Sequence, residues 1–295
     1  DPRVQQLPAI AVADPQAAFL QIALTLRPPR PRPPRGVSPH AIVSPSAVIG
    51  TDCWVGPGVV IGDDVVIGNH CEIHPTVVIG AGCRIGNDVV LYPHVVLYHE
   101  TILEDRCIIH AGAIIGADGF GYRFVNRAFE KIPQLGWVHV HADCEIGAGA
   151  MVDRGMIGAT VIGQGTKIDN MVQVAHNCQI GRHNVIASQV GLAGSCTTGD
   201  YVRIGGQVGI KDHVTLNSGC SIGAKGAVHK DVPAGETWIG YPATPEAEQK
   251  RLVFSLKRVP EMREQLKAME SRVAELTSKL NTLLDGDDQS QIRAA

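Results

Sequence analysis

The sequence has few aromatic residues and no long apolar run. Phe, Trp and Tyr make up 4% of the 295 residues, so a large core must be filled by aliphatic side chains and cysteine. No apolar stretch approaches the roughly 20 residues that a membrane-spanning helix requires. The N-terminus also lacks the charged-then-apolar pattern of a secretion signal. We therefore expect a soluble, cytoplasmic protein.

An excess of positive charge is also missing. The chain has 26 Lys and Arg against 29 Asp and Glu, which gives a formal net charge of −3. Nucleic-acid-binding proteins usually carry a clear basic patch or a basic overall balance. We therefore expect no nucleic-acid partner.

The eight cysteines lack the close pairing of a zinc site or a disulfide framework. Each occupies the fifth position of a six-residue repeat: Cys53, Cys71, Cys83, Cys107, Cys144, Cys178, Cys196 and Cys220. This regular placement favours small, unreactive core residues. Cys178 and Cys196 are 18 residues apart, so a disulfide between stacked coils is conceivable, but the expected compartment argues against it.

The six-residue period dominates the chain. Residues 162–233 divide into twelve consecutive hexads, and aliphatic residues occupy eleven of the twelve first positions. Residues 49–120 hold another twelve hexads, and residues 140–157 hold three more. One coil cannot bury its apolar side chains alone, whereas stacked coils share a core. The pattern predicts a mainly β fold, a left-handed parallel β-helix of hexapeptide repeats with about nine coils and a C-terminal α-helical extension.

The repeats divide the chain into three expected regions. Residues 1–39 contain a helix capped by Asp14 and a Pro/Arg-rich linker, which either contacts an anion or is simply solvated. The β-helix spans residues 40–245, and an insertion at 121–139 is expected to form a loop beside a functional site. Residues 246–295 are expected to form helices interrupted at Pro260, with a frayed tail from Leu284.

The C-terminal region carries an apolar seam. Beyond Pro260, apolar residues recur every three or four positions: Leu266, Met269, Val273, Leu276, Leu280 and Leu283. Such a seam requires a partner helix, and a triangular prism offers flat faces to its neighbours. A closed three-fold homotrimer satisfies both requirements. Alternatively, the helix folds back on the prism of its own chain.

Candidate catalytic residues follow from their register in the hexads. His176 lies in the segment Gln-Val-Ala-His-Asn, residues 173–177. Asp169 lies on the preceding face, Gly194 one coil further on, and His213 two coils on. His176 would be a general base held in one tautomer by Asp169, and an N–H near Gly194 would stabilise an oxyanion, with His213 assisting. Alternatively, His176 is an ordinary surface histidine; a zinc site would need a third imidazole in register.

Several motifs resemble those of the UDP-3-O-acylglucosamine N-acyltransferase family of lipid A biosynthesis, within the hexapeptide acyltransferase superfamily. The similarity extends from about residue 14 to 243. It is carried by Gly116-Ala117-Asp118-Gly119-Phe120-Gly121-Tyr122, Lys131-Ile132-Pro133-Gln134, Asp153-Arg154-Gly155, Ile168-Asp169-Asn170, Gln173 to Asn177 and Gly240-Tyr241-Pro242-Ala243. Hexads alone occur in many acyltransferases, whereas the loop motif combined with the block around His176 is much more specific.

This resemblance implies a homotrimer that takes a 3-hydroxyacyl group from the phosphopantetheine of acyl carrier protein. The acceptor would be the 2-amino group of UDP-3-O-acylglucosamine, and no bound cofactor or metal is implied. The resemblance makes His176 the base, Asp169 its orienting carboxylate, Gly194 the oxyanion donor and His213 a second imidazole near the thioester. It implies substrate contacts by Asn170, Gln173, Phe120 and Tyr122. The C-terminal helices resemble the family's carrier-protein docking region, where basic residues suit an acidic partner.

The chain departs from the family pattern at its N-terminus. Only the last helix of the family's uridine-binding domain, residues 14–26, has a counterpart, so the chain is either a fragment or a paralogue with another acceptor. Three further alternatives remain open. One is an O-acyltransferase acting on UDP-N-acetylglucosamine, whose signature has a histidine where Gln173 stands. Another is an acyltransferase acting on a different amino sugar nucleotide. The last is a non-catalytic trimeric β-helix scaffold.

Overall fold

In the computed structural model, the described residues are 10–28, 33–239 and 246–292. The chain divides into two compact units, residues 1–240 and residues 241–295. The motif at residues 240–243 and part of the predicted linker lie outside the described residues. No helix in the described part of the chain contains an 18-residue stretch apolar enough to cross a membrane.

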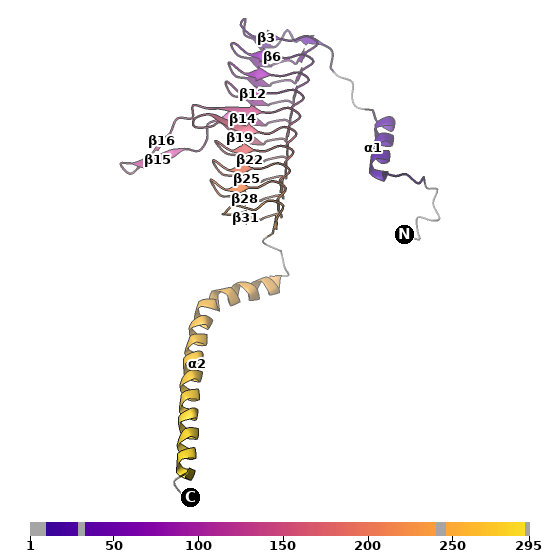
Figure 1. Ribbon diagram of the computed structural model, residues 1–295. Coiled ribbons are helices and arrows are strands. Elements are labelled where there is room, and N and C mark those ends of the chain that lie inside the picture. Colours follow the sequence, from indigo (N-terminus) through magenta and orange to yellow (C-terminus); the bar gives the residue numbers. More distant parts are fainter. Residues whose placement is uncertain (1–9, 29–32, 240–245, 293–295) are drawn as a thin grey trace. The chain divides into compact units, whose positions relative to one another are not determined.

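Most of the first unit is a stack of parallel β-coils, seen edge-on in Figure 1. Each coil contributes one short strand to each of three sheets, which we call faces A, B and C. Face A contains β1 (Gly36–Val37), β4 (Trp54–Val55), β7 (Glu72–Ile73), β10 (Val90–Leu91), β13 (Ile108–Ile109), β18 (Glu145–Ile146), β21 (Lys167–Ile168), β24 (Val185–Ile186), β27 (Arg203–Ile204), β30 (Ser221–Ile222) and β32 (Thr237–Trp238).

Faces B and C are built in the same way. Face B contains β2 (Ile42–Val43), β5 (Val60–Ile61), β8 (Val78–Ile79), β11 (Val96–Leu97), β14 (Ile114–Ala117), β19 (Met151–Asp153), β22 (Gln173–Val174), β25 (Gly191–Leu192), β28 (Gly209–Ile210) and β31 (Ala227–Val228). Face C contains β3 (Val48–Ile49), β6 (Val66–Ile67), β9 (Arg84–Ile85), β12 (Ile102–Leu103), β17 (Trp137–Val140), β20 (Ala159–Ile162), β23 (Gln179–Ile180), β26 (Thr197–Thr198) and β29 (Thr215–Leu216). The predicted parallel β-helix is therefore confirmed.

The core consists of the hexad positions that were predicted to point inward. Most of the aliphatic first positions are buried, Ile73 and Val174 fully so, whereas Ile49 in the first hexad is only partly buried; all eight cysteines at the fifth positions are buried as well. Burial raises the pKa of the Cys71 thiol to about 12, so this side chain acts as a small apolar group. Thr198, the one first position in residues 162–233 that is not aliphatic, is buried and accepts a hydrogen bond from Asn184 Nδ2 at 2.6 Å.

The solenoid is longer than predicted, because the three faces hold 11, 10 and 9 strands. β1 begins at Gly36, before the predicted boundary at residue 40, and β32 adds a strand after Pro233. A terminal coil has a neighbour on one side only, so its side chains are less buried: Val37 is 49% exposed. The hexad pattern depends on buried apolar residues. Because the terminal coils bury fewer of them, the pattern is weak at both ends of the solenoid and predicts too few coils.

The insertion is a hairpin rather than a plain loop. It leaves face B after β14 and forms β15 (Tyr122–Val125) and β16 (Ala128–Lys131), which pair antiparallel and project from the stack (Figure 1). Asn126 and Arg127 connect them with positive φ angles of 50° and 63°, as in the two-residue turns that match strand twist. The sequence lacks the Asn-Gly or Asp-Gly signal of such turns, so the hairpin was missed.

Two helices complete the described structure. α1 (Pro15–Leu26) begins as predicted, with Asp14 Oδ1 accepting the N–H groups of Gln16 and Ala17 at 3.0 Å. α2 (Glu246–Ile292) is one helix that continues through Pro260, so the predicted interruption and the frayed tail are both wrong. Figure 1 shows a bend in its first part, which a helix-internal proline explains.

The apolar seam of α2 is exposed in the single chain. Its described members, Leu266, Met269, Val273, Leu276 and Leu280, are each more than 50% exposed. The side chain of Leu283 lies outside the described residues. The seam is therefore available to a partner helix, and its predicted role in a trimer stays a prediction.

Candidate active site

His176 lies at the corner between faces B and C, directly after β22. Its imidazole is held between two glycine backbones. A Cβ added to Gly119, in the insertion, would lie 2.5 Å from His176 Cβ, and one added to Gly194 would lie 2.6 Å from His176 Cε1. Neither glycine can carry a side chain without displacing the ring. The insertion and the next coil therefore fix the position of His176.

A hydrogen bond from His176 to Asn177 defines the tautomer of His176. Asn177 Oδ1 accepts the N–H of Met156 at 2.9 Å, and Asn177 Nδ2 donates to the carbonyl of Ile157 at 2.9 Å. The amide orientation of Asn177 follows from these two contacts. Its Oδ1 also lies 3.1 Å from His176 Nδ1, which must then carry the proton. Nε2 then carries a lone pair and has no hydrogen-bond partner among the described residues, as a general base requires.

The structure does not bring Asp169 or Asn170 to His176 within one chain. Both are exposed at the other edge of face B, where a groove is lined by His110, Glu145 and Lys167 as well. Asp169 Oδ1 accepts the N–H of Asn170 at 2.7 Å. Residues seven apart lie on successive corners of a coil, and successive corners are different edges of the prism. Within one chain, the hydrogen bond that orients the His176 ring is therefore made to Asn177 and not to Asp169, for which this role was predicted.

Gly194 and His213 stack on the corner of His176, as the 18-residue register predicts. The N–H of Ser195 donates to the carbonyl of His176 at 2.9 Å, and the N–H of His213 donates to that of Gly194 at 3.1 Å. The N–H of Gly194 has no acceptor among the described residues, so it can donate to a substrate oxygen. The side chain of His213 is exposed at the same edge.

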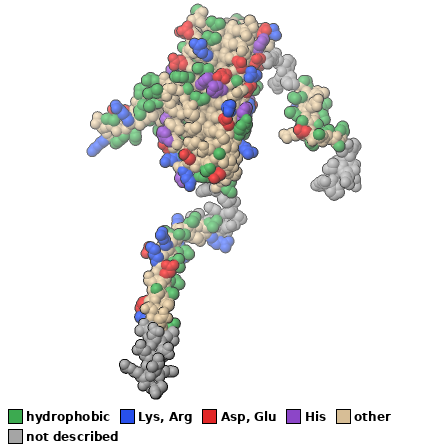
Figure 2. Space-filling model, viewed as in Figure 1, with side chains coloured by type: hydrophobic (Ala, Val, Ile, Leu, Met, Phe, Trp, Pro, Cys, Tyr) green, Lys and Arg blue, Asp and Glu red, His purple; other side chains and the backbone are tan. Residues whose placement is uncertain are grey.

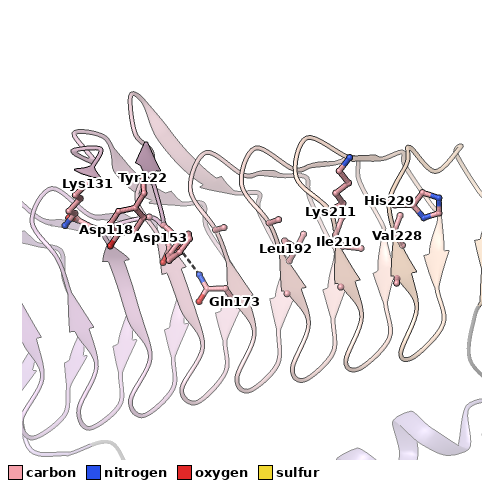
Figure 3. A pocket seen from close by; sticks show the side chains of 17 residues that line it. Asp118, Tyr122, Lys131, Asp153, Gln173, Leu192, Ile210, Lys211, Val228 and His229 are labelled. Atoms are coloured by element: carbon pink, nitrogen blue, oxygen red, sulfur yellow. Dashed lines mark hydrogen bonds and ion pairs between the residues drawn. The ribbon is translucent and has the colours of Figure 1, made fainter. Parts of the chain in front are cut away.

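A groove of about 820 Å³ extends along face B next to this corner. Figure 3 shows Asp118, Lys131 and Tyr122 at one end and Lys211 and His229 at the other. Asp118 and Lys131 form an ion pair. His176 itself is not among the lining residues; its neighbours Ala175, Gly119 and Ala193 are. The groove thus passes the imidazole at its rim.

The floor of the groove has almost no side chains. The outward positions of four successive coils are aligned in register, namely Gln173, Gly191, Gly209 and Ala227. A Cβ added to Gly191 or Gly209 would meet no atom within 4 Å. Packing therefore does not require glycine at these two positions. The absence of side chains instead leaves a smooth trough along the strand stack.

Asp153 is a site residue whose role the sequence interpretation missed. It is buried at the end of β19, and its Oδ2 accepts Gln173 Nε2 at 2.9 Å (Figure 3). Burial raises the pKa of Asp153 to about 6, although the hydrogen bond from Gln173 opposes this rise. Asp153 appeared only within a family-like motif, because the hexad pattern gives no sign of its burial. A pKa near neutrality is typical of functional sites.

Arg154 was missed for the same reason and anchors the base of the insertion. It is buried, and its Nε donates to the carbonyl of Gly116 at 2.7 Å while Nη2 donates to that of His99 at 2.9 Å. Gly116 has a φ angle of 91° at an irregularity between β14 and β19. Arg154 therefore holds the point where the chain leaves face B towards the site.

The insertion brings aromatic side chains to the groove. Phe120 and Tyr122 line it, with ring centroids 5.0 Å apart, and Phe120 is 85% exposed. Figure 2 shows hydrophobic side chains gathered where the hairpin leaves the stack. Gln134 is buried beside Gly119, and its Oε1 has no hydrogen-bond partner among the described residues. The site thus combines an oriented base, a free N–H donor and an apolar trough, which suits transfer of an apolar acyl group.

The sequence matches the family model described as bacterial transferase hexapeptide (six repeats) over residues 46–81, 82–117 and 159–194. The chain is similar to UDP-3-O-acylglucosamine N-acyltransferase 2 of Rhodopseudomonas palustris (strain BisB18), with 39% identity over 291 residues. This match covers 97% of the chain and 78% of the relative. A second relative is UDP-3-O-acylglucosamine N-acyltransferase of Parvibaculum lavamentivorans (strain DS-1). It is 59% identical over 157 residues, and the match covers 53% of the chain and 44% of the relative.

A third relative, UDP-3-O-acylglucosamine N-acyltransferase 2 of Nitrobacter winogradskyi (strain Nb-255), is 53% identical over 159 residues, covering 54% of the chain. The match spans 47% of that relative, so the chain covers about half the length of relatives such as this one. Among solved structures, Arabidopsis UDP-N-acetylglucosamine acyltransferase is similar, with a TM-score of 0.65 and 26% identity. That match covers 70% of this chain and 71% of the Arabidopsis chain.

Proposed function

The chain belongs to the UDP-3-O-acylglucosamine N-acyltransferase family, and we propose that it transfers a 3-hydroxyacyl group from acyl carrier protein to the 2-amino group of UDP-3-O-acylglucosamine. The observation that carries this proposal is the state of His176. Its Nδ1 proton is directed to Asn177, its ring is fixed between Gly119 and Gly194, and its Nε2 is free beside the trough of face B.

The proposed reaction needs a base for the attacking amine. The amine nitrogen attacks the thioester carbonyl carbon, and His176 Nε2 takes the proton that the nitrogen loses. The carbonyl oxygen becomes an oxyanion, to which the Gly194 N–H would donate. The C–S bond then breaks, and the leaving thiolate receives the proton from His176. Positioned general bases typically contribute about 10²- to 10⁴-fold in rate.

The trough supports an acyl donor carried on a long, thin arm. Its floor of Gly191, Gly209 and Ala227 accepts an extended chain without steric conflict. Phe120 and Tyr122 offer an apolar surface at the end nearest His176, and Gln173 and Asp153 offer polar contacts there. The donor would supply its own phosphopantetheine, so the proposal includes no bound cofactor.

The proposal includes a homotrimer and a docking site for acyl carrier protein. The exposed seam of α2 supports association through helices, because its described members are apolar and more than half exposed. Basic residues of α2, including Arg251 and Lys257, would suit an acidic carrier protein. A donor of this kind would place the reaction in the cytoplasm.

The experiment that tests the function is acyl transfer in vitro. The full chain is incubated with 3-hydroxyacyl carrier protein and UDP-3-O-acylglucosamine, and N-acylated product is measured by mass spectrometry. We expect His176→Ala to lower the rate by about 10²- to 10⁴-fold without loss of fold. His70→Ala, at an exposed corner of another coil, is the matched control and should retain full activity. Undiminished transfer by a folded His176→Ala protein would contradict the role of His176.

A further inference from the structure

Face C carries a second group of chemically active side chains, which the proposed reaction does not use. Glu104 directly follows β12; in the next coil, His139 lies in β17 and His141 directly follows that strand. Ile102 pairs with His139 and Leu103 with Val140, so Glu104 lies beside His141. Glu104 Oε1 is 2.9 Å from His139 Nε2 and 2.9 Å from His141 Nδ1.

These contacts bring three potential ligand atoms to one point. His139 and His141 flank the inward-facing Val140, so both side chains point outward on the same side. One ring nitrogen of each converges on a single carboxylate oxygen, and all three ligand atoms lie within 4.8 Å of one another. Among the described residues, no other three His, Cys, Asp or Glu side chains come this close.

We propose that Glu104, His139 and His141 bind a divalent transition metal ion of the Zn²⁺ type. Two imidazoles and one carboxylate form a known zinc ligand set, with bonds of about 2.0–2.2 Å, so tetrahedral ligand atoms lie roughly 3.3 Å apart. The two N···O separations of 2.9 Å are within a few tenths of an ångström of this value. Small side-chain movements would therefore admit the ion.

The surroundings of the cluster support an ion. Glu104 Oε2 accepts the N–H of Ala142 at 3.0 Å, so the carboxylate is oriented by a second contact, as is common around metal ligands. The three side chains are between 26% and 40% exposed, which leaves a path from solvent. A hollow of about 350 Å³ lies next to Glu104, lined also by Asp105 and Arg84. Three protein ligands leave the remaining coordination position for water.

A simpler contact between a histidine and a glutamate occurs elsewhere in the β-helix and provides a control. His110 Nε2 lies 2.9 Å from Glu145 Oε1, with similar exposure. That pair has one imidazole and one carboxylate, so it offers two ligands only. If Glu104, His139 and His141 were merely a hydrogen-bonded cluster, its response to metal would not differ from that of this pair.

An ion at this position would join β17 to β12. β17 is the strand in which the chain returns from the insertion to the stack, and β12 belongs to the coil before the insertion. The ion would thus stabilise the coil that carries the inserted hairpin, on a face other than that of the groove. This inference is independent of the proposed acyl transfer.

The test uses the full chain, freed of any histidine tag and dialysed against EDTA. Co²⁺ is added as a spectroscopic probe, Zn²⁺ affinity is measured by competition with a chromophoric chelator, and the Tm is recorded with and without Zn²⁺. We expect one Co²⁺ per chain with the visible absorption of a four- or five-coordinate ion. Zn²⁺ should displace Co²⁺ and raise the Tm, whereas Mg²⁺, which prefers oxygen ligands, should do neither.

Substitutions then identify the ligands. Glu104→Gln and His141→Gln should each weaken Zn²⁺ binding at least about 100-fold, since loss of an outer partner alone typically costs 10- to 100-fold. His110→Gln should leave the affinity unchanged. Glu104→His restores three ligands and should retain Co²⁺ binding with a shifted spectrum, a result that a merely unfolded variant cannot give. Absence of the Co²⁺ absorption, or equal binding by His141→Gln and the wild-type chain, would overturn the proposal.

Discussion

The coils before the insertion and the coils after it share one inner surface but differ on the outer surface of face B. Inside, both halves have mostly aliphatic first positions, and valine, cysteine or a smaller residue at most fifth positions. Outside, the early strands carry Val60, Val78 and Val96, whereas the aligned late strands carry Gly191 and Gly209. The inward positions therefore build the fold in both halves, and the outward positions are free to differ between a plain surface and a substrate trough.

The largest expected effect tests whether the inner surfaces are equivalent. Ile73, before the insertion, and Ile204, after it, are both inward residues of face A with 0% and 2% exposure. We expect Ile73→Ala and Ile204→Ala each to lower the free energy of unfolding by about 2–5 kcal/mol, because each leaves a cavity in a close-packed core. Urea denaturation followed by circular dichroism measures this. A large loss in one half with almost none in the other would show that the halves are not equivalent inside.

A second prediction concerns Asp153, the buried carboxyl in the coils after the insertion. The pKa of Asp153 is about 6 in the folded chain and near 3.8 when exposed, so folding favours the protonated form. Its contribution to stability is complete below the unfolded pKa of 3.8 and is lost as the pH rises through 6, by about 3 kcal/mol for this shift. Asp153→Asn mimics the protonated form and removes this loss.

The measurement for Asp153 is chemical denaturation of both proteins at several pH values. The stability of Asp153→Asn relative to the wild-type chain should increase between pH 4 and pH 7 and then remain constant. The difference cancels the titration of other groups, so it isolates this carboxyl. A stability difference that does not vary with pH would contradict the raised pKa of Asp153.

The third and smallest effect exchanges the two outer surfaces. Gly209→Val introduces, after the insertion, the valine that occupies the outward position of face B before it. A Cβ at Gly209 would have no atom within 4 Å. We expect kcat/KM for acyl transfer to fall roughly 10- to 100-fold, or about 1.4–2.7 kcal/mol in transition-state stabilisation, with the Tm unchanged or raised, because valine suits a strand better than glycine.

The reciprocal variant, Val78→Gly, is the control for this exchange. It removes an outward valine on β8 of the same face. We expect a loss of up to about 1 kcal/mol in stability, the usual effect of glycine within a strand, and no change in kcat/KM. Full activity in Gly209→Val would show that the trough does not receive the donor.

The sequence was sufficient for the core and for part of the site. The hexad period is carried by inward residues, so it predicted the coils and the stacking of His176, Gly194 and His213. It could not predict the Asn177 contact, since that depends on how Met156 and Ile157 leave the coil. Asp153 and Arg154 were missed in the same way, because their burial arises from the irregular segments on both sides of them.

The register of the coils also decides how the chain can change in length. Aligned residues are 18 apart in most of the prism, but Leu103 pairs with Val140 across the insertion and Val140 pairs with Ile162 across the next irregular segment. After each of these two longer coils, the following coils return to the same alternation of inward and outward side chains. Removal of whole coils would keep every later side chain on its face, whereas a deletion that is not a whole number of coils must be absorbed at a corner. Eighteen residues is thus the natural unit in which such a chain can be shortened or extended without moving its active groups out of phase.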